Sequence, residues 1–226
     1  MQTMFESAGR SVALYQPDAP DSARVIVYLN TFEPGEGGAI WAQLTGSCLA
    51  LACVTPADWN KDLSPWPAPR VFAKGGDFEG MADDYLGLLI GTIMPETEAR
   101  LTARTTRRCL AGYSLAGLFS LYALTKTGQF DGVGSMSGSL WYDGFVEHMR
   151  AGMPPRPGAM AYLSLGDREA DTRNPRMAKV LDCTRQAEAI LRESGMETLF
   201  ELNPGGHYAN VTARMAKGIS WLADKV

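Results

Sequence analysis

Short apolar runs recur along the chain and alternate with segments of helical period. The runs are nearly continuous, which predicts strands of a parallel sheet that is covered on both faces. A weaker run over residues 11–16 predicts an antiparallel edge strand. The predicted buried strands span residues 24–30, 47–54, 106–112, 132–137, 159–166 and 198–202.

Between these strands, apolar positions repeat every three or four residues and predict amphipathic helices. Gly195 suits the residue just after a helix, and Pro95 predicts a new turn rather than a continued helix. The alternation predicts a doubly wound, mostly parallel α/β sheet with helices on both faces. We expect residues 1–226 to form one such domain with a minimal lid. The predicted helices span residues 78–93, 115–126, 176–194 and 211–222.

Composition narrows the function classes. The net charge is −4 and no basic stripe is present, which argues against a nucleic-acid partner. No apolar run approaches the roughly 20 residues needed to span a bilayer, so no membrane role is predicted. The first residues lack a signal-peptide pattern, and we therefore expect a cytoplasmic protein. The four cysteines are expected to be reduced core residues.

Residues 112–117, Gly-Tyr-Ser-Leu-Ala-Gly, join a predicted strand directly to a predicted helix. They follow the G-x-S-x-G pattern, in which small residues flank a serine because strand and helix backbones nearly touch. The serine hydroxyl then points out from the carboxyl edge of the sheet. Ala116 stands at the last small position, one methyl group larger than glycine. This context predicts Ser114 as the nucleophile of an α/β-hydrolase.

A serine hydroxyl needs a base within hydrogen-bond reach, and the chain offers two histidines. His148 lies in a short polar helical segment and is expected to be a surface residue. His207 lies in a glycine-rich loop between the last predicted strand and the last helix, where the chain order of α/β-hydrolases requires the base. Two isolated histidines do not supply a metal site. We therefore predict His207 as the base, with no metal and no cofactor.

Carboxylates follow the predicted strand 159–166 at Asp167, Glu169 and Asp171. One of them would hold the imidazole tautomer and stabilise the imidazolium that forms during attack. Glu169 is favoured, with Asp167 as the next candidate, and a Ser-His dyad without an acid is the remaining alternative.

The oxyanion hole of such an enzyme needs two backbone N–H groups. The residue after the nucleophile, Leu115, supplies one, and Thr31 or Phe32 is predicted to supply the second. Aromatic side chains either line a substrate pocket or cap the core under a loop. The candidates for substrate contact are Tyr113, Trp59, Trp66 and Trp141.

The segment CLAGYSLAGLFSLYAL and the later stretch Met-Ser-Gly-Ser-Leu-Trp at 136–141 resemble the "GHSLGGLF…SPSLWW" stretch of esterase D-like, siderophore-esterase proteins. The resemblance covers nearly the whole chain. It implies an α/β-hydrolase fold, cleavage of ester or lactone bonds, Ser114 as nucleophile and His207 as base. The chain departs from the pattern at Tyr113, at Thr31-Phe32 and at Gly138, so the reaction class carries over and the substrate does not.

The leading hypothesis is a serine hydrolase that cleaves a small carboxylic ester through an acyl-enzyme. Trilactone siderophores are one candidate substrate class. Thioesterases and peptidases use the same machinery. A catalytically silent α/β-hydrolase that binds a ligand or a partner is the alternative of a different class, and it predicts Ser114 and His207 too far apart to hydrogen-bond.

Overall fold

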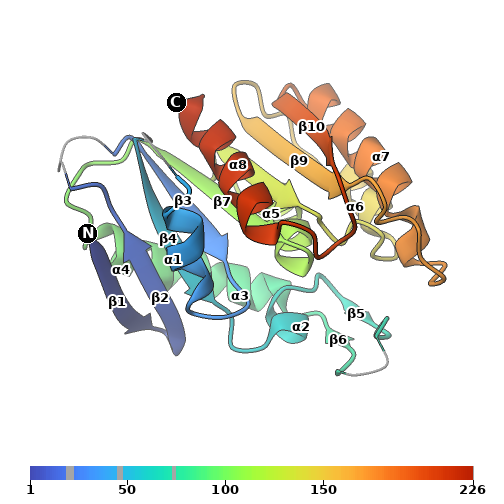
Figure 1. Ribbon diagram of the computed structural model, residues 1–226, viewed down its shortest axis with the longest axis horizontal. Helices are drawn as coiled ribbons and strands as arrows, with labels where there is room; N and C mark the ends of the chain where they lie inside the picture. Colours follow the sequence, from blue (N-terminus) through green and yellow to red (C-terminus); the bar gives the residue numbers. More distant parts are fainter. Residues whose placement is uncertain (19–22, 45–47, 73–74, 226) are drawn as a thin grey trace.

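The computed structural model describes residues 1–18, 23–44, 48–72 and 75–225 (Figure 1). Its centre is an eight-stranded sheet in the order β1-β2-β4-β3-β7-β8-β9-β10. The strands are β1 (Gln2–Ser7), β2 (Arg10–Tyr15), β3 (Val25–Asn30), β4 (Leu49–Thr55), β7 (Arg107–Tyr113), β8 (Gly132–Met136), β9 (Met160–Gly166) and β10 (Glu197–Asn203). A small second sheet pairs β5 (Pro67–Ala68) with β6 (Phe78–Glu79).

The sheet is parallel from β4 through β10 and antiparallel at β1 and β2. The predicted mostly parallel α/β sheet is therefore confirmed. The run at 11–16 is antiparallel as expected, but its predicted edge position is wrong because β1 covers it. A tight turn at Ala8 and Gly9, both with positive φ, joins these two strands. The start of the predicted strand 47–54, at residue 47, lies outside the described residues.

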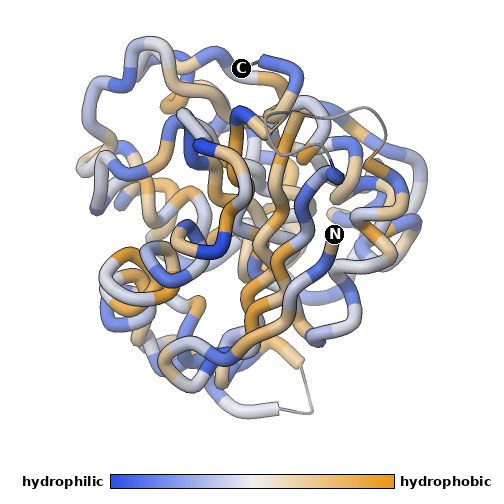
Figure 2. The backbone as a smooth tube through the Cα atoms, turned by 90° about the vertical axis from the view of Figure 1, so that its left-hand side faces the viewer, coloured by the Kyte–Doolittle hydropathy of each residue, from blue (hydrophilic) through white to orange (hydrophobic). Residues whose placement is uncertain are grey.

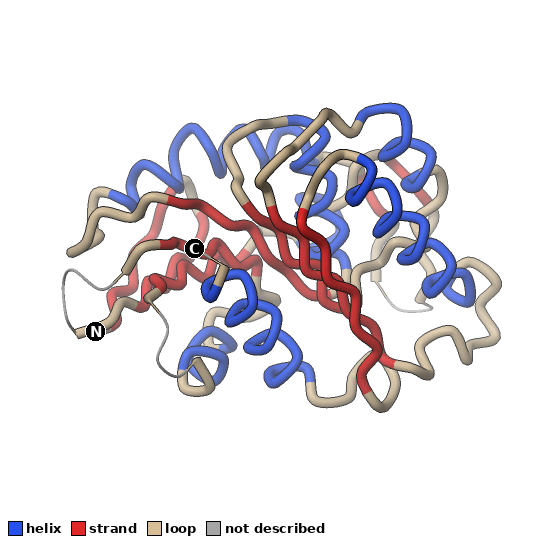
Figure 3. The backbone as a smooth tube through the Cα atoms, turned by 90° about the horizontal axis from the view of Figure 1, so that it is seen from above, coloured by secondary structure: helices blue, strands red, loops and turns tan. Residues whose placement is uncertain are grey.

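Helices cover both faces of the sheet (Figure 3). Helices α1 (Glu36–Trp41) and α8 (Val211–Asp224) pack against each other on the face toward the viewer in Figure 1. The opposite face carries α5 and the helices that pack around it. These are α3 (Ala82–Leu88), the π-helical turn η1 (Leu89–Ile93), α4 (Met94–Glu98), α5 (Leu115–Lys126), α6 (Phe145–Gly152) and α7 (Val180–Glu193), preceded by the 3-10 turn η2 (Met177–Lys179); α2 (Trp59–Asp62) is a short helix after β4.

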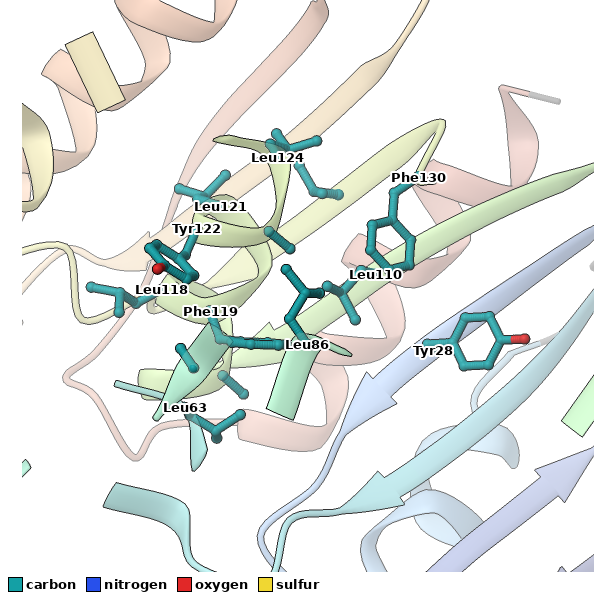
Figure 4. Packing of buried hydrophobic residues seen from close by; sticks show 14 of the residues in the cluster. Tyr28, Leu63, Leu86, Leu110, Leu118, Phe119, Leu121, Tyr122, Leu124 and Phe130 are labelled. Atoms are coloured by element: carbon teal, nitrogen blue, oxygen red, sulfur yellow. The ribbon is translucent and has the colours of Figure 1, made fainter. Parts of the chain in front are cut away.

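Two apolar cores result, because alternate residues of each strand point to opposite faces. In β3, Ile26 and Tyr28 join the core under α5, whereas Val27 and Leu29 join the core under α1 and α8. Apolar residues consequently gather along the central strands (Figure 2). In Figure 4, Leu118, Phe119 and Leu121 of α5 cluster with Leu110 of β7 and Leu86 of α3. This two-sided burial explains the continuous apolar runs in the sequence.

Pro95 does not end the preceding helix as predicted. The helix continues from Ala82 to Glu98 through the π turn, in which the Met94 N–H donates to the Leu89 carbonyl. A proline has no N–H and its ring clashes with the carbonyl four residues earlier in a regular α-helix. The wider turn lets the proline ring fit at this point.

Two further predictions about single residues need correction. All four cysteines are free thiols, but Cys48 is exposed rather than a core residue. His148 is half-buried rather than a surface residue. Its ring stacks on Tyr122 and bonds to the Thr125 hydroxyl at 3.0 Å. Across the described segments, no helix combines the length and the apolar character that crossing a membrane requires.

Candidate active site

Ser114 lies in the turn between β7 and α5, at the carboxyl edge of the sheet. Its backbone has φ 58° and ψ −121°, a conformation that L-residues rarely adopt. Hydrogen bonds hold it there, because its N–H donates to the Met136 carbonyl at 3.0 Å and its carbonyl accepts from the Ser139 N–H at 3.0 Å. The strained backbone presents a half-buried hydroxyl above the sheet.

Small residues around Ser114 are required by the close approach of β7 and α5. A Cβ added to Gly112 would lie 2.4 Å from the Ala116 Cβ and backbone. A Cβ on Gly117 would lie 3.0 Å from the Gly112 carbonyl oxygen. The methyl of Ala116 is therefore accommodated because Gly112 has no side chain.

The structure brings Ser114, His207 and Glu169 together. The Nε2 atom of His207 lies 3.2 Å from Ser114 Oγ, and its Nδ1 lies 2.7 Å from Glu169 Oε2. Ser114 follows β7, Glu169 follows β9 and His207 follows β10, so three loops at one edge of the sheet supply the three side chains. An imidazole between a hydroxyl and a carboxylate can take a proton from the one while the other fixes its tautomer.

Glu169 is held as a buried carboxylate, with a side chain that is 4% exposed. Burial raises its pKa, but hydrogen bonds outweigh this effect and lower the pKa of Glu169 to about 2. Those bonds come from the His207 ring, from the Ser137 hydroxyl at 2.5 Å and from the Gly166 N–H at 2.5 Å. The carboxylate is thus ionised beside the imidazole at neutral pH.

Asp167, the second candidate for the acid, does not reach His207. Its Oδ1 accepts the Gly205 N–H at 2.8 Å, and its own N–H donates to the Asn203 carbonyl at 2.8 Å. Asp167 therefore ties the loop after β9 to the loop that carries His207. The two loops also touch through Gly166, where an added Cβ would lie 2.2 Å from the Gly205 carbonyl oxygen.

Arg214 of α8 is a buried cation that the sequence analysis missed. Its side chain is 3% exposed and its guanidinium lies 3.1 Å from Glu169 Oε1. The same guanidinium donates to the Tyr113 hydroxyl at 2.8 Å and to the Ser137 hydroxyl. The signal was present in the sequence, because Arg214 is a charged residue three positions after Val211 on the apolar stripe of its helix.

Tyr113 belongs to this support rather than to a substrate pocket. Its side chain is buried, and its hydroxyl donates to the His207 carbonyl at 2.6 Å. Both its ring and its hydroxyl are engaged beneath the His207 loop, and these contacts do not favour the predicted contact with substrate. Burial raises the pKa of Tyr113, which keeps the hydroxyl available as a donor.

Ser139 is a second serine at the site. Its Oγ lies 3.3 Å from Ser114 Oγ, and the residue is 4% exposed. It belongs to the loop after β8 that also carries Ser137, whose φ is 47°. The signal for this loop in the sequence was the Ser-Gly-Ser stretch at 137–139.

The three predicted oxyanion-hole donors differ in whether their backbone N–H already has a hydrogen-bond acceptor. Leu115 begins α5, where the backbone N–H groups have no acceptor in a preceding turn. Thr31 is wrong as a donor, because its N–H donates to the Val54 carbonyl at 3.0 Å and the residue is 1% exposed. The N–H of Phe32 donates to the Glu36 carboxylate at 2.8 Å. Phe32 stays the prediction for the second donor.

The three tryptophans separate into two groups. Trp59 packs edge-on against Phe32, a residue that is 61% exposed, with ring centroids 5.3 Å apart. Trp66 packs against Tyr142 and His148, and its Nε1 donates to the Asp143 carbonyl at 3.2 Å. These contacts favour the core-capping alternative for Trp66.

Trp141 also takes a core position. Its side chain is buried and its ring lies near Phe78 and Tyr142. The Arg176 guanidinium lies over the ring, 5.5 Å from its centroid. Of the three tryptophans, Trp59 is therefore the one that adjoins the exposed Phe32.

Comparisons with known proteins agree with this architecture. The Esterase family model, described as "Putative esterase", matches residues 39–210. "Uncharacterized protein YbbA" of Bacillus subtilis (strain 168) is 26% identical over 185 residues, which are 78% of this chain and 74% of that protein.

Solved structures share the fold. An IroE-like serine hydrolase from Shewanella oneidensis has a TM-score of 0.80 at 17% identity, covering 99% of this chain and 80% of that one. The siderophore hydrolase EstB from Aspergillus nidulans has a TM-score of 0.73 at 18% identity, covering 99% and 95%.

Proposed function

The chain belongs to the Esterase family of carboxylic-ester hydrolases. We propose that it cleaves a small ester, with Ser114 as nucleophile, His207 as base and Glu169 as the acid that orients the base. The observation that carries this proposal is the continuous chain of contacts, with 3.2 Å from Ser114 Oγ to His207 Nε2 and 2.7 Å from His207 Nδ1 to Glu169.

In the acylation half, Ser114 Oγ attacks the ester carbonyl carbon and its proton passes to His207 Nε2. The carbonyl oxygen becomes an oxyanion, which the Leu115 N–H at the start of α5 stabilises together with a second N–H from the segment after β3. The intermediate collapses when His207 gives the proton to the leaving alcohol oxygen. This leaves the acyl group on Ser114.

In the deacylation half, His207 takes a proton from water, and the resulting hydroxide attacks the acyl carbon. The second oxyanion forms in the same place and collapses when the proton returns to Ser114 Oγ, releasing the carboxylic acid. Glu169 stays ionised throughout and stabilises the imidazolium that forms in each half. No cofactor is needed for this sequence of steps.

The exposed ring of Phe32 and the neighbouring Trp59 favour an ester with an apolar or aromatic group. Aromatic faces contribute a large apolar contact area to a ligand. Lactone cleavage uses the same steps, with the alcohol remaining attached to the product. Because EstB is a siderophore hydrolase, a siderophore lactone is the second substrate class to assay. The short Ser114–His207 distance argues against a catalytically silent protein.

Hydrolysis of p-nitrophenyl acetate by the wild type and by Ser114→Ala tests the proposal. Removal of the nucleophile in a triad enzyme lowers kcat by a factor on the order of 10⁶, so we expect no turnover above background for Ser114→Ala. Ser220→Ala on the outer part of α8 is the matched control and should keep wild-type activity. Equal activity of wild type and Ser114→Ala would refute the assignment.

A further inference from the structure

The backbone N–H expected to complete the oxyanion hole is occupied by a carboxylate. The Phe32 N–H donates to Oε2 of Glu36 at 2.8 Å. Glu36 is the first residue of α1 and is half-buried. A carboxylate oxygen and the oxyanion of a tetrahedral intermediate are both anionic acceptors, so they compete for one N–H.

The segment after β3 leaves the sheet at the same edge as the turn that carries Ser114. β3 pairs with β7 in parallel, with Asn30 opposite Gly112. β3 ends at Asn30 and β7 at Tyr113, so Phe32 and Ser114 both belong to the connections that begin at this edge of the sheet. Thr31 cannot take over the role, because its N–H is bonded to β4 and its hydroxyl lies 3.3 Å from that of Thr55.

The charge of Glu36 has little compensation. Within the described segments of the chain, no lysine or arginine forms an ion pair with it. Its hydrogen bond to Phe32 and the positive end of α1 are the stabilising contacts. When an ester carbonyl takes the Phe32 N–H, the carboxylate has to leave that N–H, yet its attachment to α1 keeps the charge next to the site.

We propose that Glu36 determines substrate charge specificity: its carboxylate occupies the second oxyanion donor at rest and disfavours esters that carry a negative group near the scissile carbonyl. This inference rests on the proposed function of Ser114. Substrates displace Glu36 from Phe32 at a cost that is the same for every ester, and anionic acyl groups meet an additional repulsion. The preferred substrates are therefore neutral or cationic around the carbonyl.

The test compares Glu36→Gln with the wild type on two p-nitrophenyl esters of matched length, the neutral pentanoate and the anionic glutarate monoester. A like-charge contact in a partly solvated site changes rates by about tenfold. We expect Glu36→Gln to raise kcat/KM a few-fold for the pentanoate. For the glutarate monoester the increase should be about ten times larger than the increase for the pentanoate. Glu33→Gln, an exposed carboxylate of the same loop, is the matched control and should leave the ratio of the two rates unchanged.

A merely structural role for Glu36 gives another result. If its carboxylate only holds the turn of residues 32–35, Glu36→Ala will slow both esters equally and Glu36→Gln will match the wild type. That outcome, or an unchanged ratio of the two esters in Glu36→Gln, overturns the inference. Thermal unfolding of each variant excludes misfolding as the cause. Failure of the proposed function is recognised separately, because activity would then persist in Ser114→Ala.

Discussion

Two opposite charges lie buried side by side at the site, the guanidinium of Arg214 and the carboxylate of Glu169, with side chains 3% and 4% exposed. Such a pair stabilises little in total, because desolvation offsets the attraction. Loss of one partner is costly, because the other charge is then buried alone. Arg214 also bonds to the hydroxyl of Tyr113, which in turn holds the His207 backbone. Arg214 therefore holds Glu169 directly and the His207 backbone through Tyr113, the two residues proposed as acid and base.

Replacing Arg214 should lower stability and activity together. We expect Arg214→Met to lower the free energy of unfolding by about 3 kcal/mol, the cost of leaving a charge unpaired, and to reduce kcat because Glu169 is no longer held. Urea unfolding and kcat measured well below Tm check both effects. Lys217→Met on the exposed side of α8 is the control, since that lysine forms only a surface ion pair with Glu201.

A double-mutant cycle that combines Arg214→Met with Glu169→Gln distinguishes a positioning role of Arg214 from a general packing role. If Arg214 acts through the carboxylate, Arg214→Met should cost much less kcat in the Glu169→Gln background than in the wild type. Additive losses would assign Arg214 to packing alone. Arg214→Lys keeps the charge without the planar fork and should recover part of the activity.

At the scale of elements, the turn from β7 into α5 brings residues 112 and 116 face to face, and only one of the two can carry a side chain. Gly112 is the position without a side chain, and the Ala116 methyl fills the space in front of it. We expect Gly112→Ala to lower the free energy of unfolding by roughly 1–3 kcal/mol or more, as overpacking does, and to displace Ser114. Ala116→Gly removes a methyl without forming a contact, so it should cost about 1 kcal/mol, as a glycine in a helix does, and retain activity.

Thermal unfolding and p-nitrophenyl acetate turnover of the two variants check this difference. A Gly112→Ala protein as stable and active as Ala116→Gly would contradict the packing account of the elbow.

The elements that could be predicted from the sequence are those whose pattern is local. Helix α5 has the predicted bounds 115–126, because a strand-like run and an apolar stripe flank the elbow directly. β1 was missed, because its residues alternate between exposed and half-buried and form no continuous apolar run. The helix through Pro95 was missed, because a proline in a helical pattern predicts an end and the π turn that accommodates it cannot be seen in that pattern.

The site likewise divides into residues that a local sequence pattern could indicate and residues whose role depends on contacts between distant parts of the chain. Ser114, His207 and Glu169 could be proposed from chain order and loop composition. The failure of Thr31 could not be foreseen, because its N–H bonds to β4, which is distant in sequence. Arg214 was visible only as a charge on an apolar helical stripe, because its partners Glu169 and Tyr113 are distant in sequence. Glu36 was missed although its partner Phe32 lies only four residues earlier.

At the scale of the whole molecule, the site is built at one edge of the sheet, from the segments that follow β3, β7, β8, β9 and β10. Ligand sites of open α/β sheets lie at this edge as a rule. A groove of about 480 Å³, lined by Leu199, Lys217 and Trp221, lies instead between β10 and α8. It contains none of the residues proposed here for catalysis.

The pH dependence of global unfolding should report the buried acid. The pKa of Glu169 is lowered from 4.5 to about 2 in the folded protein. Its stabilising contribution is therefore present above pH 4.5 and is lost as the pH falls toward 2. A shift of this size corresponds to roughly 3 kcal/mol.

Urea unfolding at a series of pH values, for wild type and Glu169→Gln, measures this contribution. We expect the free energy of unfolding of the wild type to fall more steeply below about pH 4.5 than that of Glu169→Gln. Parallel curves would show that the carboxylate is not held in its ionised form as the structure indicates.

Reaction with a fluorophosphonate, followed by mass spectrometry of the intact protein and of its peptides, tests the role of Ser114 most directly. The reagent forms a stable adduct with a serine that a neighbouring base activates. We predict one adduct per chain, located on Ser114, with no labelling of Ser114→Ala and strongly slowed labelling of His207→Ala. An adduct on Ser139, the serine 3.3 Å away, or no adduct on the folded wild-type protein, would contradict the account.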